Sequence, residues 1–132
     1  MKIIADTNIL IRAITGDDPR QSAAAQAALS EAEVVALPLA ALCELVWVLA
    51  RGYKIPLPEI AEAIRRLTNG ATVMVNHQAV AAGLAMLESG GDFADGIIAQ
   101  EGRWLGADTF VSFDRRAVAL IEAQGHEVHL LA

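Results

Sequence analysis

The sequence lacks the features that mark a secreted or membrane protein. A single cysteine, Cys43, among 132 residues excludes an internal disulfide, as expected for a protein of a reducing compartment. No apolar run approaches the roughly 20 residues of a membrane-spanning helix. The N-terminus has one lysine followed by an acidic turn, so we expect no signal peptide. These absences predict a cytoplasmic protein with no membrane partner.

Basic residues are also scarce. The chain has 10 lysines and arginines against 16 aspartates and glutamates, which gives a net charge of −6. This charge argues against binding nucleic acid by a basic surface alone. Several carboxylates that converge on divalent cations would, however, reverse the local field at their site. The formal charge therefore does not exclude a nucleic-acid substrate.

Apolar residues make up 55% of the chain, and much of this fraction is alanine. A chain of this length forms one domain, residues 1–132, and buries roughly two-thirds of its unfolded surface. The apolar surplus indicates a surface that binds a second copy or another protein. Alanine-rich helices, such as the one expected over 20–32, would also raise the fraction by themselves. We predict a homodimer with such helices at its interface.

Short apolar runs alternate with amphipathic segments along the whole chain, without repeats or linkers. This alternation predicts parallel strands covered by helices on both faces of the sheet. The expected strands span 3–5, 34–37, 72–75, 109–113 and 127–131. The expected helices span 9–14, 20–32, 39–51, 58–68, 77–89, 93–105 and 115–123.

Two aspartates follow expected strands directly. Asp6 comes after the first strand and Asp114 after the fourth. In open α/β sheets, ligands bind in the crevice outside the carboxyl ends of the strands. Asp6 or Asn8 could instead cap the helix that follows. The first motif alone leaves both interpretations open.

Glu44 is the one anion in the most apolar helix, 39–51. An ionised carboxylate in apolar surroundings is unfavourable unless it is paired or bound to metal. The alternative is a helical stripe that faces water, formed by Ala40, Glu44, Trp47 and Arg51.

Asp92 and Asp95 open the helix expected over 93–105. With Asp92 as N-cap, Asp95 occupies the third helical position. The two carboxylates then share a face and repel unless a cation lies between them. The alternative is that Asp92 and Asp95 only cap the helix, in an arrangement that resembles a capping box. Asp17 and Asp18, by contrast, are interpreted as solvated loop residues.

The remaining carboxylates can converge at one edge of a doubly wound sheet; they are Asp6, Glu44, Asp95 and Asp114. Such a cluster stays ionised only if cations compensate it. Oxygen ligands without His or Cys suit Mg²⁺ or Mn²⁺. A site of this kind activates water and holds phosphate oxygens.

The acidic motifs of the chain resemble those of PIN domains, in particular the short VapC-type toxins of toxin–antitoxin pairs. The resemblance rests on Asp6-Thr7-Asn8, Glu44, the stretch Asp92-Phe93-Ala94-Asp95-Gly96-Ile97-Ile98, and Ser112-Phe113-Asp114. It implies a three-layer α/β/α sandwich with a mainly parallel central sheet. It also implies a Mg²⁺- or Mn²⁺-dependent endoribonuclease that forms a homodimer and binds an antitoxin protein.

The resemblance also implies a role for each residue. Asp6 and Asp95 correspond to the principal metal ligands, and Glu44 and Asp114 complete the acidic cluster. The supporting residues are Asn8, Ser112 and Asp92. Gly96 departs from the alanine common in the family, so we expect a looser helix start.

Arg115 and Arg116 follow Asp114 at the start of a helix, where cations oppose the helix dipole. Helix stability therefore does not favour them there. We hypothesise that at least one of them contacts RNA phosphate, the alternative being that both are simply solvated.

Two other functions involve a similar set of carboxylates. A receiver-type signalling domain also gathers carboxylates around Mg²⁺, but it needs a lysine at the end of a late strand, and neither Lys2 nor Lys54 is so placed. A metal-binding interaction module without catalysis is the other alternative, and the intact set of carboxylates argues against it.

Overall fold

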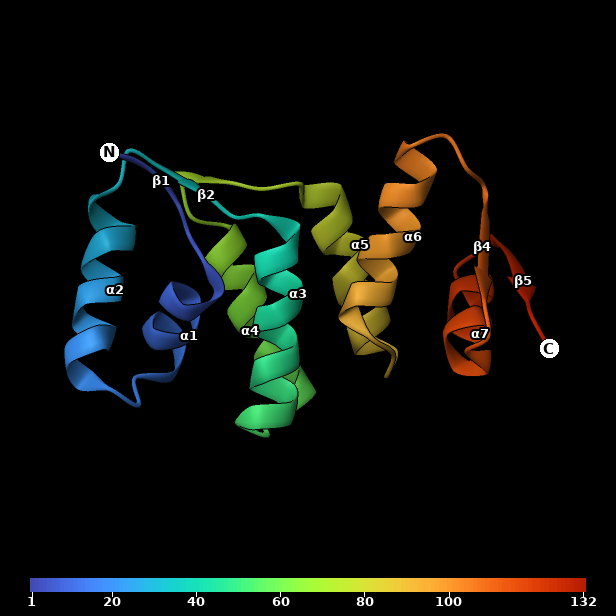
Figure 1. Ribbon diagram of the computed structural model, residues 1–132, viewed down its shortest axis with the longest axis horizontal. Coiled ribbons are helices and arrows are strands. Elements are labelled where there is room, and N and C mark those ends of the chain that lie inside the picture. Colours follow the sequence, from blue (N-terminus) through green and yellow to red (C-terminus); the bar gives the residue numbers. More distant parts are fainter. The chain divides into compact units, whose positions relative to one another are not determined.

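The computed structural model describes residues 1–132, and the chain divides into two compact units. Unit 1 spans Met1–Asn76 and unit 2 spans His77–Ala132. Each unit has its own helices and its own parallel strands (Figure 1). No helix combines the length and the apolar character that crossing a membrane requires.

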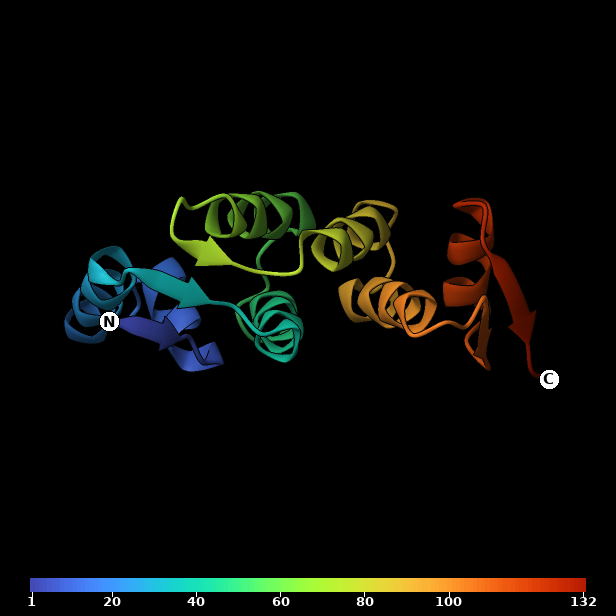
Figure 2. The same cartoon turned by 90° about the horizontal axis from the view of Figure 1, so that it is seen from above.

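Unit 1 contains a parallel sheet of three short strands in the order β1-β2-β3. These strands, which lie side by side in Figure 2, are β1 (Lys2–Ile4), β2 (Val34–Ala36) and β3 (Val73–Met74). Its α-helices are α1 (Thr7–Thr15), α2 (Pro19–Glu31), α3 (Leu39–Trp47) and α4 (Leu57–Thr68). The strand and helix predictions are thus confirmed here, with ends that differ by a few residues.

The core of unit 1 is built from apolar side chains that repeat at helical spacing. Leu42, Leu45 and Leu49 are fully buried along one side of α3 and its continuation. Ile60 and Ile64, four residues apart on α4, are equally buried. Each such side chain contributes about 1.5–3 kcal/mol relative to an exposed one. This packing fixes α3, the helix on which Glu44 lies.

The predicted helix over 39–51 ends differently from the prediction. The α-helix stops at Trp47, and a π-helical turn, η1 (Val48–Gly52), completes it. The backbone N–H of Tyr53 donates to the carbonyl of Val48 at 3.1 Å, a spacing of five residues. The wider turn was not predictable from the apolar period, which is nearly the same for both helix types.

The end of η1 is tied to the α1–α2 turn through Asp17. The Tyr53 hydroxyl donates to Asp17 Oδ2 at 2.7 Å, and the Thr15 hydroxyl donates to Oδ1 at 2.9 Å. The Arg12 guanidinium forms a salt bridge to Oδ1 at 3.0 Å. Asp18 caps α2 by accepting from the N–H of Gln21 at 3.1 Å. Both aspartates lie in the turn between α1 and α2 and Asp17 is exposed, which agrees with the interpretation as solvated loop residues, and both also accept hydrogen bonds there.

These hydrogen bonds favour the ionised form of Asp17, with that from Tyr53 having the largest effect, and they lower the pKa of Asp17 to about 2. A depressed carboxyl pKa contributes stability that is present above the ordinary value of 3.8 and is lost as the pH falls toward 2. We expect Tyr53→Phe to raise the pKa of Asp17, and Thr15→Val to raise it less. Carboxyl NMR titration measures both, and an unchanged Asp17 titration in Tyr53→Phe would contradict the assignment.

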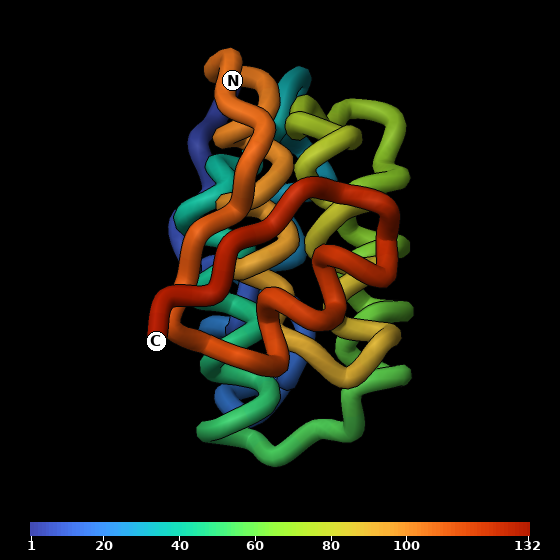
Figure 3. Tube along the Cα trace, turned by 90° about the vertical axis from the view of Figure 1, so that its right-hand side faces the viewer, coloured from blue at the N-terminus to red at the C-terminus, as the bar shows by residue number.

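Unit 2 pairs a helical hairpin with a second parallel sheet. Its helices are α5 (His77–Glu88), α6 (Phe93–Trp104) and α7 (Arg115–Ala123), and its strands are β4 (Thr109–Ser112) and β5 (Glu127–Leu130). The strands pair in register from Thr109 opposite Glu127 to Ser112 opposite Leu130. Helix α7 runs alongside both strands (Figure 3). Ile121 of α7 packs with Met86 and Ala99 to form a buried cluster.

Helices α5 and α6 cross very closely because glycines face each other's helix. A Cβ atom on Gly83 would lie 2.7 Å from the ring of Phe93. A Cβ atom on Gly96 would contact the carbonyl oxygen of Ala82 and lie 2.9 Å from the Cα of Gly83. The hairpin therefore holds the start of α6, with Asp92 and Asp95, against α5.

Candidate functional site

Asp6 connects β1 to α1 and caps the helix. Its Oδ1 accepts a hydrogen bond from the N–H of Ile9 at 3.0 Å. Strand β1 is continued by Ala5, whose N–H donates to the carbonyl of Ala36 at 3.1 Å. The cap interpretation is thus correct, but it uses one oxygen only. Oδ2 of the exposed carboxylate remains free to bind a ligand.

Glu44 is exposed on α3, and so are the other members of its stripe, Ala40, Trp47 and Arg51. The solvent-facing stripe proposed as the alternative is therefore present. Exposure does not separate the two interpretations, because a metal ligand in an open crevice also faces solvent.

The charges of Asp92 and Asp114 act on Asp95 within unit 2. Burial raises the pKa of Asp95, which is only half-buried, and the charges of Asp92 and Asp114 raise it further. Asp92 caps α6 by accepting from the N–H of Ala94 at 2.9 Å. Asp92 and Asp114 thus lie close enough to Asp95 for their charges to act on it.

Asp114 is held in place by both of its neighbouring elements. Its Oδ1 accepts from the N–H groups of Arg116 and Ala117, each at 3.0 Å. Its own N–H donates to the hydroxyl of Ser112 at 2.9 Å. Ser112 belongs to β4, and its carbonyl accepts from the N–H of Leu131 at 2.9 Å. Ser112 therefore orients Asp114 from the end of the strand.

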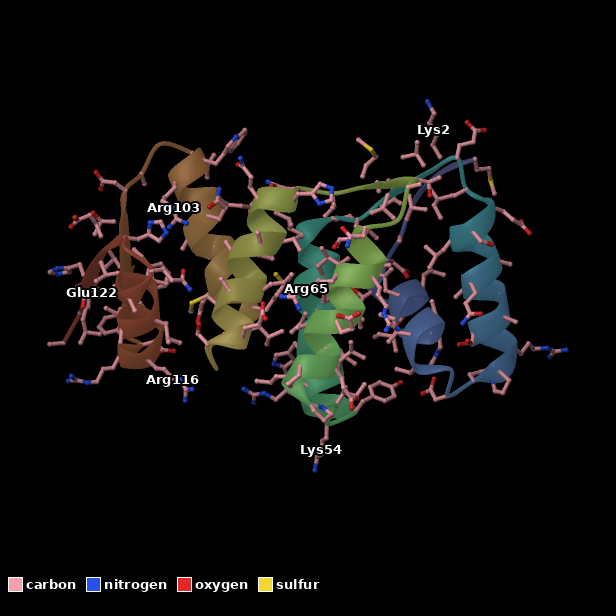
Figure 4. All side chains as sticks on the ribbon, turned by 180° about the vertical axis from the view of Figure 1, so that it is seen from behind. Lys2, Lys54, Arg65, Arg103, Arg116 and Glu122 are labelled. Carbon is pink, nitrogen blue, oxygen red and sulfur yellow. The ribbon has the colours of Figure 1, made fainter.

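Arg115 and Arg116 are exposed at the start of α7. Neither side chain forms an ion pair with a carboxylate. A Cβ atom on Gly90 would lie 2.7 Å from Nη2 of Arg116, so this guanidinium lies against the α5–α6 turn. Figure 4 labels Arg116 on α7 and Arg103 near the end of α6. The turn that Arg116 contacts leads directly to Asp92.

The predicted supporting residue Asn8 lies in a groove that the sequence did not indicate. Asn8 is exposed on α1 and lines a groove between α1 and α2 together with Arg12 and Gln21. Asn8 and Arg12 lie four residues apart on one helix, a spacing that places them on the same face. Gln21 comes from another helix, so its part in the groove needed the structure.

A family model for the PIN domain matches residues 3–122. The chain belongs to the PIN-domain family. No curated protein matches it. PIN domains have a nuclease-type fold and generally use divalent metal ions. The expected fold class, an α/β/α fold of the PIN type with parallel strands, is confirmed by this match together with the parallel pairing of the strands.

The donor set of this PIN domain suits the metals that such nucleases use. Its candidate ligands are carboxylates, without a histidine or cysteine among them, which is the chemistry that Mg²⁺ and Mn²⁺ favour. The structure has no ready-made group of three or more acidic, histidine or cysteine side chains that could hold a metal ion. Asp6 and Glu44 belong to unit 1, and Asp95 and Asp114 to unit 2.

Proposed function

We propose that this PIN domain is a Mg²⁺- or Mn²⁺-dependent endoribonuclease and the toxin of a toxin–antitoxin pair. Asp6 and Asp95 would be the principal metal ligands, with Glu44 and Asp114 as further ligands. The observation that carries the proposal is the match of the PIN-domain family model to residues 3–122. The pKa of Asp95, which burial and the charges of Asp92 and Asp114 raise, supports it. A carboxylate whose charge is unfavourable in the metal-free protein is a candidate for a functional site.

The side chains around Asp95 fit this role. Asp95 must lose its proton to bind a cation, and a bound cation would relieve the repulsion from its neighbours. Bound metal would supply an activated water and would stabilise charge on the scissile phosphate. Ser112 and the start of α7 fix Asp114, so little reorganisation is needed at this carboxylate.

At least one of Arg115 and Arg116 would contact the phosphate backbone of the RNA. Both guanidinium groups lack a carboxylate partner and lie next to Asp114 in the sequence. Their charge would offset part of the repulsion between RNA and an acidic protein.

The proposal includes the assembly of the protein. We expect residues 1–132 to work as a single PIN-like domain in the cytoplasm, to form a homodimer, and to bind an antitoxin protein. The apolar fraction of 55% supports a further protein contact. Light scattering at tens of micromolar tests the dimer, and a monomeric mass would contradict it.

Cleavage of RNA by the purified protein tests the nuclease directly. We expect cleavage with Mg²⁺ or Mn²⁺, none with chelator, and a loss of at least about 100-fold in Asp6→Asn. Asparagine caps a helix as well as aspartate, so α1 should remain intact. Asp18→Asn is the matched control, because Asp18 also caps a helix of unit 1 and is no part of the proposed site.

Two results would overturn this assignment. Wild-type rates in Asp6→Asn would remove Asp6 from the metal site. Metal binding without cleavage of any RNA would favour the interaction module that has lost catalysis.

A further inference from the structure

The groove between α1 and α2 begins at Asn8, two residues after Asp6, and has a volume of about 460 Å³. Its lining consists of Asn8, Ile9, Arg12, Gln21, Ala24 and Ala25. The lining thus combines two amides and a guanidinium with the apolar side chains of Ile9, Ala24 and Ala25. Binding sites for small ligands and single bases combine an apolar surface with a few placed polar groups in this way.

Arg12 is fixed in the groove before any ligand binds. Its Nε donates to Oε1 of Gln21 at 2.7 Å, and its Nη1 donates to Oδ1 of Asp17 at 3.0 Å. Asp17 is itself held by Thr15 and Tyr53. A long side chain that is already ordered loses little entropy on binding, so its remaining donors bind a ligand more favourably.

Three hydrogen-bonding groups of the groove have no partner within the protein. They are Nη2 of Arg12, Nε2 of Gln21 and the amide of Asn8. The first two are donors only. Asp17 balances the charge of Arg12 at 3.0 Å. The groove therefore offers directed donors without a net positive charge, which suits a neutral group with acceptor atoms better than a phosphate.

We propose that this groove binds a base of the RNA substrate close to the cleaved bond, and that its donors favour guanine. Guanine presents two acceptors, O6 and N7, on one edge, and the groove has two free donors for them, Nη2 of Arg12 and Nε2 of Gln21. Six residues of helix separate Asp6 from Arg12, a rise of roughly 9 Å. The groove thus lies near Asp6 along α1. This inference rests on the proposed nuclease function and adds a base preference to it.

Gln21→Glu separates the two roles of Gln21. Glutamate keeps the acceptor for Nε of Arg12 but replaces the free donor by a second acceptor. The variant should lose the preference for guanine by about tenfold or more and shift toward adenine or cytosine, whose amino groups N6 and N4 lie on the edge where guanine presents only acceptors. Gln26→Glu is the matched control, since Gln26 lies on the same helix outside the groove and donates to the carbonyl of Ala13.

The test is the cleavage of a random-sequence RNA pool with Mg²⁺ or Mn²⁺, followed by sequencing of the product ends. Thermal melting of each variant reports its folding. A guanine preference at one position that Gln21→Glu removes and Gln26→Glu retains would support the inference. Cleavage without base preference, or with a preference that Gln21→Glu leaves intact, would overturn the inference and leave the nuclease standing. No cleavage at all by the wild type would overturn the nuclease itself.

Discussion

Asp95→Asn should reduce RNA cleavage by at least about 100-fold and should slightly stabilise the metal-free protein. The first effect follows from the loss of a proposed metal ligand, whose charge an amide cannot replace. The second follows from the surroundings of Asp95, because burial and the charges of Asp92 and Asp114 make its ionised form unfavourable. An active site that trades stability for function behaves in this way.

The raised pKa of Asp95 determines how the stability difference between Asp95→Asn and the wild type changes with pH. The pKa of Asp95 is raised above the ordinary value of 3.8. The protonated carboxyl therefore contributes stability that is fully present below pH 3.8 and is lost as the pH rises through the raised pKa. Asparagine does not ionise, so Asp95→Asn does not lose this stability as the pH rises. Its advantage at pH 7 should be small, because solvent screens a half-exposed carboxyl, and should vanish near pH 3.

Thermal melting with and without Mg²⁺ checks the prediction. Bound metal should raise the Tm of the wild type, by an amount set by its affinity, and should raise that of Asp95→Asn much less. Glu101→Gln is the control, because it removes the same charge from an exposed position of the same helix. An Asp95→Asn variant that responds to Mg²⁺ and cleaves RNA like the wild type would remove Asp95 from the proposed site.

The acidic motifs could be found in the sequence because an aspartate between a strand and a helix can both cap the helix and offer an oxygen to a ligand. A strand followed by an aspartate and a helix places that aspartate at the carboxyl end of the strand and at the N-cap. Asp6 and Asp114 both occupy this position, and both make the cap hydrogen bonds. The sequence alone presented cap and ligand as alternatives. In the structure one carboxylate oxygen caps and the other is free, so the two interpretations are compatible.

Features that depend on distant residues could not be found in the same way. Tyr53 reaches Asp17 across 36 residues, and no periodicity links the two. Arg12 and Gln21 meet only because α1 and α2 pack together. Glu44 remained ambiguous because a lone anion on an apolar helix fits a solvated stripe and a ligand equally well. The role of Gly96 likewise became visible only with α5 beside it.

Gly96→Ala should destabilise the protein by roughly 1–3 kcal/mol and should also lower RNA cleavage. The sequence predicted a looser helix start at this glycine. The N–H of Gly96 does make a long hydrogen bond to the carbonyl of Asp92, at 3.4 Å. The larger effect is tertiary, because the added Cβ would contact the backbone of Ala82, which cannot rotate away as a side chain could. Overpacking of this kind commonly lowers stability by 1–3 kcal/mol or more.

The two helices would have to separate to admit the methyl group, and Asp95 precedes the altered residue directly. Cleavage should therefore fall even at temperatures where the variant remains folded. Gly102→Ala is the matched control, because Gly102 lies on the same helix with no atom within 4 Å of an added Cβ. That substitution should stabilise the protein by up to about 1 kcal/mol, as expected for glycine replaced by alanine inside a helix. Urea unfolding of both variants measures the difference, and equal stability of the two would contradict the close crossing of α5 and α6.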